Sequence, residues 1–558
     1  MLRITELRLP LDHPEAALRS AILKRLGIAD AELLDISVFR RGYDARKKTA
    51  IVLTYTLDVT LADEATVLAR LAHDKQIRPA PDTRYRFLGH APADFRESGR
   101  PRPLVIGFGP CGLFAALILA QMGLAPIVLE RGKAVRQRTK DTWGLWRRSE
   151  LNPESNVQFG EGGAGTFSDG KLYSQISDRR HLTRKVLTEF VKAGAPDEIL
   201  WVSKPHIGTF RLVSMIEKMR ADIVALGGEI RFEQRVVDFV IEGEGEARQL
   251  RGVVLASGEQ LRADHVVLAP GHSARDTFAM LQQHGVCLEA KPFSIGFRVE
   301  HPQGLIDAAR FGPNAGHPVL GAADYKLVHH ARNGRSVYSF CMCPGGTVVA
   351  ATSEAQRVVT NGMSQYSRNE RNANAGIVVG ISPDDYRQGQ YEGPVNPLDG
   401  VAFQRIWESR AYELGGGDYL APGQLVGDFV KRQPSRTLGE VEPSYKPGVH
   451  LTDLAQPGRG SLPDYALDAI REALPAFERQ IKGFSRPDAV LTGVETRTSS
   501  PLRITRGRDY QSLNLRGLFP AGEGAGYAGG IMSAGVDGIE AAEALAADLL
   551  GLPLPLAS

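Results

Sequence analysis

The stretch that most constrains the fold of this chain is residues 103–130, PLVIGFGPCGLFAALILAQMGLAPIVLE. The pattern predicts a short buried strand, a glycine turn, a helix with an apolar face, and a second buried strand that ends in an acid. A strand, a helix and a strand in this order form the βαβ unit of a Rossmann-type parallel sheet. We therefore expect an α/β protein built around this unit.

The turn in this unit has the residues that a dinucleotide needs. Gly107, Gly109 and Gly112 fill the G-x-G-x-x-G frame, where they allow a sharp turn, a close approach of backbone amides to a pyrophosphate, and tight helix packing. Pro110 suits the first helical turn, whose unpaired N–H groups attract phosphates. Glu130, about 18 positions after the last glycine, can bind ribose hydroxyls and would repel a 2′-phosphate. The stretch predicts a dinucleotide site, and a turn that only serves packing is the alternative.

Composition excludes several classes of protein. The chain has 558 residues, of which 43% are hydrophobic, and its net charge of +3 gives no reason to expect a polyanionic partner. Four cysteines argue against a disulfide framework and fit a reducing compartment. No apolar run approaches the roughly 20 residues that a membrane span needs, and the first residues lack the core of a signal peptide. We expect a cytoplasmic protein with no membrane partner.

The pattern along the chain predicts three domains, one of them interrupted. Residues 1–88 combine strand-like and helical runs and are predicted to form a small N-terminal α+β domain, followed by a linker at 89–102 that includes GRPRP. Residues 103–284 are expected to be the first part of the nucleotide-binding domain, and residues 481–558 its C-terminal part. Between them, residues 285–480 mix strands and loops and are predicted to be an inserted α+β domain.

The N-terminal domain also carries a basic cluster around Gly42. A solvated hairpin tip is the favoured interpretation, and a nucleic-acid patch is the alternative. The cluster consists of Arg40, Arg41, Arg46, Lys47 and Lys48.

A second glycine-rich segment, FGEGGAGTFSDGKL, occupies residues 159–172. It too contains the G-x-G-x-x-G frame, but no buried strand precedes it and TFSDGKL would make a poor amphipathic helix. We expect a loop whose bare backbone lies against a flat or charged ligand. The loop holds Asp169 and Lys171, and Lys171 could steer an anionic substrate, tune a cofactor, or serve only as a phosphate or structural contact.

Residues 517–550, GLFPAGEGAGYAGGIMSAGVDGIEAAEALAADLL, predict a short strand, a long glycine turn and a helix. Together with the first fingerprint, this segment resembles the glutathione-reductase-like FAD-binding fold. The resemblance implies that the first turn takes the ADP half of FAD and that the last turn meets the ribityl chain and the flavin. The start of the last helix is also suited to stabilise negative charge on a flavin ring, and a tight packing turn is the alternative.

The resemblance assigns further cofactor contacts. It places Val236 beside the adenine, Gly271 at the end of the closing turn LAPG, and Glu523 in the second FAD motif, GLFPAGE, where the family usually has Asp. In chain order, the expected FAD-binding residues are Gly107, Gly109, Pro110, Gly112, Glu130, Arg131, Gly163, Gly165, Thr166, Val236, Gly271, Gly522, Glu523, Gly529, Gly530 and Ile531.

A narrower resemblance extends over nearly the whole chain. The strings GEGGAGTFSDGKLY, SFCMCPGG, NGMSQYSRNERNANAG and GVETRTSSPLRI are similar to a bacterial family of uncharacterised FAD-dependent dehydrogenases. The resemblance implies bound FAD and a redox activity, and it supplies no substrate.

The candidate catalytic residues are Lys171, Asp169 and Arg497. Arg497 could bind a carboxylate bidentately with Glu495 orienting it, or it could belong to a buried ion pair. Cys341 and Cys343 would share one face of a strand; they are either structural, or they contact a substrate or act in redox chemistry. The histidines have no metal-ligand spacing with these cysteines, so we expect no metal.

The chain is therefore predicted to be an FAD-dependent oxidoreductase that transfers a hydride between bound FAD and a small-molecule substrate chosen by residues 285–480. Because no second convincing fingerprint is present, NAD(P)H would act only as a transient reductant, or the substrate itself would reduce the flavin. The alternatives are a flavin-dependent monooxygenase, an RNA-associated flavoprotein that uses the basic N-terminal domain, and a flavin-bound scaffold without turnover.

Overall fold

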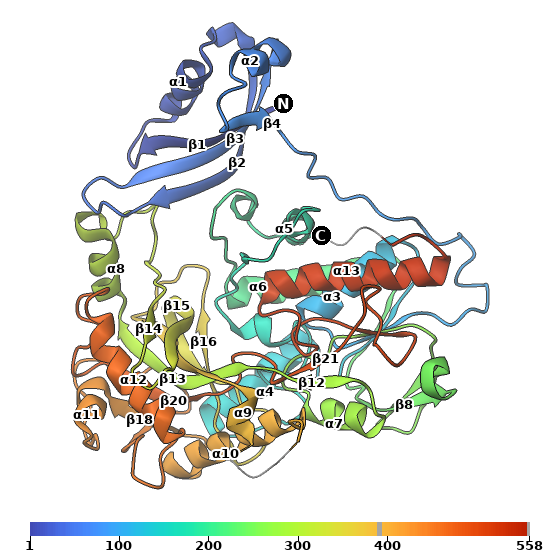
Figure 1. The fold of residues 1–558 in the computed structure, drawn as a ribbon, viewed down its shortest axis with the longest axis vertical. Coiled ribbons are helices and arrows are strands. Elements are labelled where there is room, and N and C mark those ends of the chain that lie inside the picture. Colours follow the sequence, from blue (N-terminus) through green and yellow to red (C-terminus); the bar gives the residue numbers. More distant parts are fainter. Residues whose placement is uncertain (388–392, 555–558) are drawn as a thin grey trace.

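The computed structural model describes residues 1–387 and 393–554. Figure 1 shows a small N-terminal unit at one end of the molecule and, below it, two larger bodies side by side. One body contains a parallel sheet and its helices, and the other is built on a large antiparallel sheet. Within the described residues, no helix combines the length and the apolar character that crossing a membrane requires.

The N-terminal unit is a four-stranded antiparallel sheet covered by two helices. Its strands lie in the order β2-β3-β1-β4, which is the topology of the ferredoxin-like β-α-β-β-α-β arrangement. Alternate residues of β3 are buried, as a strand with one covered face requires. The elements are β1 (Leu2–Pro10), α1 (Glu15–Leu26), β2 (Leu33–Asp44), β3 (Val52–Leu61), α2 (Glu64–Arg70) and β4 (Ile77–Pro79).

The parallel sheet has the strand order β22-β11-β5-β6-β7. After β5, the chain adds β6 and β7 on one side of it. The chain then returns to add β11 and β22 on the other side, so the strand order reverses beside β5. Such a reversal opens a crevice at the carboxyl ends of the strands, where ligands bind in α/β sheets. The strands are β5 (Leu104–Ile106), β6 (Ile127–Leu129), β7 (Glu229–Arg231), β11 (Val266–Leu268) and β22 (Leu518–Pro520).

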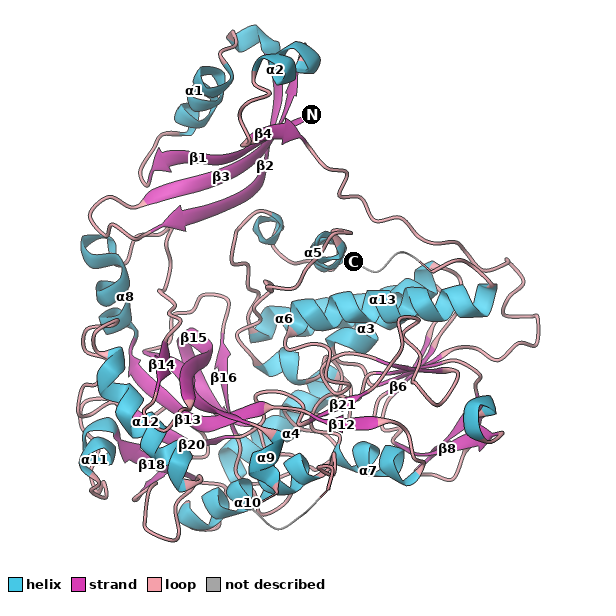
Figure 2. Cartoon of the chain, viewed as in Figure 1, coloured by secondary structure: helices cyan, strands magenta, loops and turns pink. Residues whose placement is uncertain are grey.

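Two helices that contain several glycine and alanine residues pack closely against each other on this sheet. α3 (Pro110–Gln121) follows β5 and α13 (Ile531–Leu550) follows β22, and both are buried along nearly their whole length. Figure 2 shows α13 lying across α3. The other elements of this body are α4 (Val135–Arg148), α5 (Leu182–Lys192), α6 (Thr209–Ala225), β8 (Val236–Glu242), β9 (Gln249–Leu255), β10 (Gln260–Arg262) and α7 (Arg275–Gln283).

The second body is an eight-stranded sheet in the order β14-β15-β17-β13-β20-β18-β19, with β16 paired to β15. A two-stranded sheet of β12 and β21 adjoins it along the chain. Its strands are β12 (Leu288–Ala290), β13 (Phe293–Pro302), β14 (Val328–His330), β15 (Ser336–Ala350), β16 (Thr360–Ser364), β17 (Asn372–Ile381), β18 (Ala421–Leu425), β19 (Val449–Leu451), β20 (Val490–Glu495) and β21 (Leu502–Ile504). Its helices are α8 (Gln303–Phe311), α9 (Pro383–Tyr386), α10 (Asp399–Leu414), α11 (Val426–Lys431) and α12 (Asp464–Phe477).

The return of the chain to the nucleotide-binding body differs from the expectation. The predicted C-terminal part begins at residue 481, but β20 pairs with β13 and β18 in the middle of the second sheet. The chain rejoins the parallel sheet only at β22. A fully buried strand has the same apolar pattern in either sheet, so the sequence does not distinguish the two.

The N-terminal unit contacts both bodies through its basic cluster. The backbone N–H of Arg41 donates to the Trp201 carbonyl at 2.6 Å, and the Arg41 guanidinium lies 4.5 Å from the Trp201 ring centroid. On the other body, Asn314 donates to the carbonyl oxygen of Lys48 at 2.7 Å. The expected solvated hairpin tip is therefore wrong for part of the cluster, because Arg40 and Arg41 lie within β2 and Arg41 is an interface residue.

Candidate functional site

A cavity of about 380 Å³ lies at the carboxyl ends of the parallel strands, where the strand order reverses. Its walls are the turns after β5 and β11, the glycine-rich loop, the start of α13, and residues of the second sheet that include Cys341 and Asn361. Both bodies thus contribute to the walls of one cavity.

Nearly all the residues expected to bind FAD line this cavity. They are Gly107, Gly109, Pro110, Glu130, Arg131, Gly163, Gly165, Val236, Gly271, Gly522, Glu523, Gly529, Gly530 and Ile531. Gly112 lies behind the cavity wall. A Cβ at this position would come within 2.0 Å of the Gly107 carbonyl oxygen, so a glycine is needed here for α3 to pack closely against the end of β5. Thr166 is buried beneath the loop, with its hydroxyl 3.4 Å from a guanidinium nitrogen of Arg138.

The cavity is lined by bare glycine backbone and by the starts of two helices. A Cβ built on Gly271, Gly529 or Gly530 would meet no protein atom within 4 Å, so these positions present bare backbone to open space. α3 and α13 both begin at this cavity, and the first N–H groups of a helix, together with its dipole, favour an anionic or electron-rich group. The residues present therefore fit a pyrophosphate at one helix and a flavin ring at the other.

Glu130 joins three backbone turns at the first fingerprint. One carboxylate oxygen accepts the N–H of Phe108 at 2.9 Å, and the other accepts those of Gly132 at 2.8 Å and Gly160 at 3.0 Å. A carboxylate has about four acceptor sites, so the oxygen that Phe108 uses can still accept a ribose hydroxyl. The ribose contact stays a prediction, and the packing role of Glu130 is an addition to it.

Arg138 supports the glycine-rich loop from behind the cavity wall, and the sequence analysis missed it. Its side chain is fully buried and donates to the carbonyl oxygens of Asn156, Val157 and Glu161, each at 2.7 Å, so it holds the start of the glycine-rich loop in place. Burial lowers its pKa to about 10, although Glu130 and Glu161 oppose this. The signal in the sequence is an arginine on the buried face of α4, one turn before Thr142.

Asp169 and Lys171 both line the cavity but have different partners. Asp169 forms a two-pronged ion pair with Arg368, with its first oxygen 3.0 Å from Nε, and is 1% exposed. Lys171 donates to the Met342 carbonyl, and its Nζ lies 3.8 Å from Asp169. Burial lowers the pKa of Lys171, but Cys341 and Asp169 outweigh it and the pKa is raised overall. Lys171 is therefore a partly exposed ammonium group at the cavity wall.

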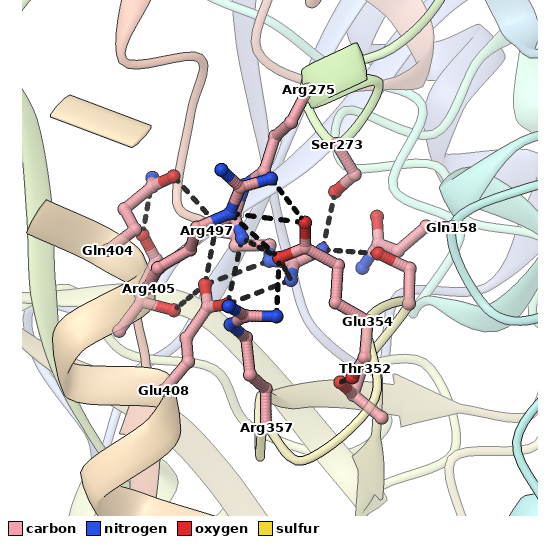
Figure 3. Close-up of polar contacts among 12 residues, drawn as sticks. Gln158, Ser273, Arg275, Thr352, Glu354, Arg357, Gln404, Arg405, Glu408 and Arg497 are labelled. Atoms are coloured by element: carbon pink, nitrogen blue, oxygen red, sulfur yellow. Dashed lines mark hydrogen bonds and ion pairs between the residues drawn. The ribbon is translucent and has the colours of Figure 1, made fainter. Parts of the chain in front are cut away.

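Arg497 belongs to the buried ion pair that the sequence analysis gave as one alternative (Figure 3). Its Nε and Nη2 bind the two oxygens of Glu408 at 3.0 and 2.9 Å, and Arg275 binds the same carboxylate at 2.7 Å. Although burial opposes it, the two guanidinium groups hold the pKa of Glu408 well below its usual range. The expected partner is wrong, because Glu495 instead binds Arg298 at 2.6 Å from within β20.

Positive charge also reaches the neighbouring cavity wall. Burial, together with Arg497 and Arg275, lowers the pKa of His272 to about 3, so its ring is neutral at physiological pH. In the described part of the chain, no group of three His, Cys, Asp or Glu side chains gathers as a metal site, and the absence of a metal stays a prediction.

Two segments of the chain match known protein families. Residues 292–498 match a family described as FAD-dependent protein, C-terminal domain-like, and residues 1–60 match a domain of unknown function (DUF8436). Among solved structures, a flavoprotein/dehydrogenase from Cytophaga hutchinsonii is 12% identical, with 82% of this chain and 80% of that chain covered and a TM-score of 0.35. The halogenase PltM is 12% identical, with 81% and 70% covered and a TM-score of 0.37. Both TM-scores are below 0.5, so the glutathione-reductase-like arrangement stays a prediction.

A relative of similar length comes from Clostridium beijerinckii. This protein, described as uncharacterized, is 45% identical over 543 residues, which cover 97% of this chain and 98% of the relative. The expectation of an FAD-dependent protein is confirmed by the match of residues 292–498. The second body thus contains the segment that matches the C-terminal-domain-like family of FAD-dependent proteins, and the chain as a whole belongs to one family with the Clostridium beijerinckii protein.

Proposed function

We propose that this protein is an FAD-dependent oxidoreductase that moves a hydride between tightly bound FAD and a small-molecule substrate. The observation that carries the proposal is the single cavity that joins the N-termini of α3 and α13 and extends to Lys171 and Cys341. When bound, FAD supplies the two-electron chemistry, and the protein supplies binding, orientation and electrostatics.

The first fingerprint is suited to hold the ADP half. Backbone N–H groups at the start of α3 would hold the pyrophosphate beside Gly109, where a Cβ would be 3.5 Å from the Gly163 backbone. Glu130 keeps one acceptor site for ribose, and Val236 lies on the wall where the adenine is expected. This arrangement would anchor the ADP half of the cofactor.

The other end of the cavity is suited to stabilise negative charge. The positive end of α13 and the ammonium group of Lys171 both border this region. Fixed positive groups of this kind favour negative charge that develops during hydride transfer, because they need no reorganisation. They would also attract an anionic substrate. The second sheet contributes Phe340 and Asn361 to the same wall, so it is placed to select the substrate.

The test is spectroscopic. Protein purified after expression with ample riboflavin should be yellow, and its flavin absorbance should bleach when an anaerobic substrate panel is added. Replacing Lys171 with Met should slow bleaching while flavin remains bound, whereas Lys192→Met, at an exposed site on α5, should not. Colourless protein that fails to take up added FAD would refute the proposal. Bleaching by NAD(P)H followed by oxygen-dependent hydroxylation of a substrate would contradict hydride transfer and assign the monooxygenase reaction.

A further inference from the structure

Strand β15 contains an irregularity where it borders the cavity. Phe340 pairs with Gly376 of β17 and Cys343 pairs with Asn374, so three steps along β15 match two along its partner. This is a β-bulge, which re-aims side chains and is common beside active sites. Cys341 lies in the bulge with a φ of 40°, a left-handed conformation that a residue with a side chain adopts only when its surroundings enforce it.

The bulge separates the environments of the two cysteines. Cys341 lines the cavity, whereas Cys343 has no exposed surface. The expectation that they share one face of a regular strand is wrong, because the extra residue breaks the alternation. They remain close, since the Cys343 thiol lies 3.3 Å from the Cys341 carbonyl oxygen. Gly362 leaves room for this thiol: a Cβ there would lie 2.7 Å from Cys343 Sγ.

Charged groups surround the pair on several sides. Lys171 donates to the Met342 carbonyl and Arg298 donates to the Cys341 carbonyl at 2.8 Å, while Asp169 and Glu495 contribute negative charge to the same wall. A hydrogen bond from Cys343 lowers the pKa of the Cys341 thiol well below its usual value, and the two cations add to this against burial and Asp169. The contact with Cys341, together with burial, raises the pKa of the Cys343 thiol.

We propose that Cys341 and Cys343 form a redox-active dithiol that exchanges with small disulfides entering the cavity. In such a pair, the accessible thiolate attacks the substrate disulfide, and the second thiol next to it resolves the mixed disulfide that forms. The inference rests on the proposed function and deepens it by naming small organic disulfides as the substrate class.

The exchange is balanced in atoms and electrons. The Cys341 thiolate attacks one sulfur of R–S–S–R′, the S–S bond breaks, and R′S⁻ leaves and takes up a proton. Cys343 then loses its proton and attacks the Cys341 sulfur, which releases RS⁻ and forms a Cys341–Cys343 disulfide. The substrate gains two electrons and the dithiol loses two. The disulfide returns to the Cys341 thiolate and the Cys343 thiol when it gains two electrons and one proton, the equivalent of one hydride. Bound FAD in its reduced form would supply this hydride equivalent, as the proposed function expects.

The full-length protein can be tested with oxidised glutathione as the probe. After treatment of the unsubstituted protein with oxidised glutathione, alkylation and peptide mass mapping should find a Cys341–Cys343 disulfide. Cys343→Ser should instead accumulate glutathione on Cys341, because the resolving thiol is missing. Cys287→Ser, which alters a cysteine outside the cavity, should form the disulfide as the unmodified sequence does. Iodoacetamide should modify Cys341 in the unsubstituted protein at a lower pH than it modifies N-acetylcysteine, and Cys343→Ala should raise that pH because it removes the largest cause of the lowered pKa.

Two outcomes overturn the dithiol. They are the absence of the Cys341–Cys343 disulfide in folded, unmodified protein exposed to oxidised glutathione, and the absence of a Cys341 adduct in folded Cys343→Ser. The flavin spectrum of each sample separates this inference from the proposed function. A yellow protein that turns over a substrate without forming the disulfide refutes the dithiol alone. A colourless protein that forms the disulfide supports the dithiol and refutes the flavoenzyme.

Discussion

Glu523 is a carboxyl group whose environment works against its charge. It lines the cavity next to the start of α13, and burial raises its pKa to about 7; Lys291 opposes this shift and Cys341 adds to it. A proton on this group turns it from an acceptor into a donor toward a ribityl hydroxyl. If Glu523 binds the cofactor as the resemblance implies, this contact would therefore depend on pH near neutrality.

Glu523→Gln tests this environment in flavin-free protein. The folded pKa lies above the usual value of 4.5, so the folded protein binds the extra proton and loses stability as pH rises from about 4.5 to about 7. Gln removes the buried charge. Thermal scans should give the variant a higher unfolding temperature than the unmodified sequence at pH 8 and the same temperature at pH 5. An equal gain at both values would show that the carboxyl is not the buried titrating group.

At the scale of elements, the glycines of α13 serve two different purposes. Gly530 opens onto the cavity, with no protein atom within 4 Å of a Cβ built there. Gly538, two turns further along the helix, permits the contact with α3, because a Cβ there would lie 2.2 Å from the Cys111 carbonyl oxygen. One helix thus offers backbone to a ligand at its start and to another helix along its length.

Alanine at each glycine should separate the two purposes. Gly530→Ala should melt at the same temperature as the unmodified protein without flavin and should bind FAD at least about tenfold more weakly, because the methyl group enters ligand space. Gly538→Ala should cost about 1–3 kcal/mol of stability through overpacking. Calorimetry and fluorescence titration with FAD measure the two effects. Unchanged FAD affinity in Gly530→Ala would place the cofactor away from this helix.

A single carboxylate on α10 joins elements of both bodies. Glu408 binds Arg275 at the start of α7 and Arg497 after β20, and all three side chains are buried. Glu408→Gln leaves two guanidinium groups without their counter-charge, so we expect a loss of about 3–5 kcal/mol. Glu440→Gln, at a 90% exposed site paired with Arg486, should cost less than about 1 kcal/mol. Calorimetry of both variants checks this, and equal losses would contradict the role of the network.

For the whole molecule, features formed by residues close together in the sequence could be predicted, and contacts between residues far apart in the sequence could not. The βαβ unit and the glycine turns are local, so residues 103–130 and the start of the last helix were predicted from pattern. The partners of Asp169 and Arg497 lie 199 and 89 positions away, and no local pattern links them. The position of β20 was missed for the same reason, because strand pairing is a long-range choice among similar apolar runs.

The N-terminal unit is attached to the nucleotide-binding body through Trp201, which contacts Arg41 of β2. Its ring lies 4.5 Å from the Arg41 guanidinium, and its carbonyl accepts the Arg41 N–H. Trp201→Ala removes the ring contact and keeps the backbone pairing, so β2 should open more often. A cation–π contact contributes about 0.5–2 kcal/mol, which corresponds to faster amide exchange by up to about 30-fold. Hydrogen exchange over residues 33–44 measures this change in rate.

The matched control is Trp143→Ala, which also removes an arginine–tryptophan contact but within α4. It should leave the amide exchange rate of residues 33–44 unchanged. If Trp201→Ala exchanges no faster than Trp143→Ala, the unit is held by its contacts near Lys48 and not by β2.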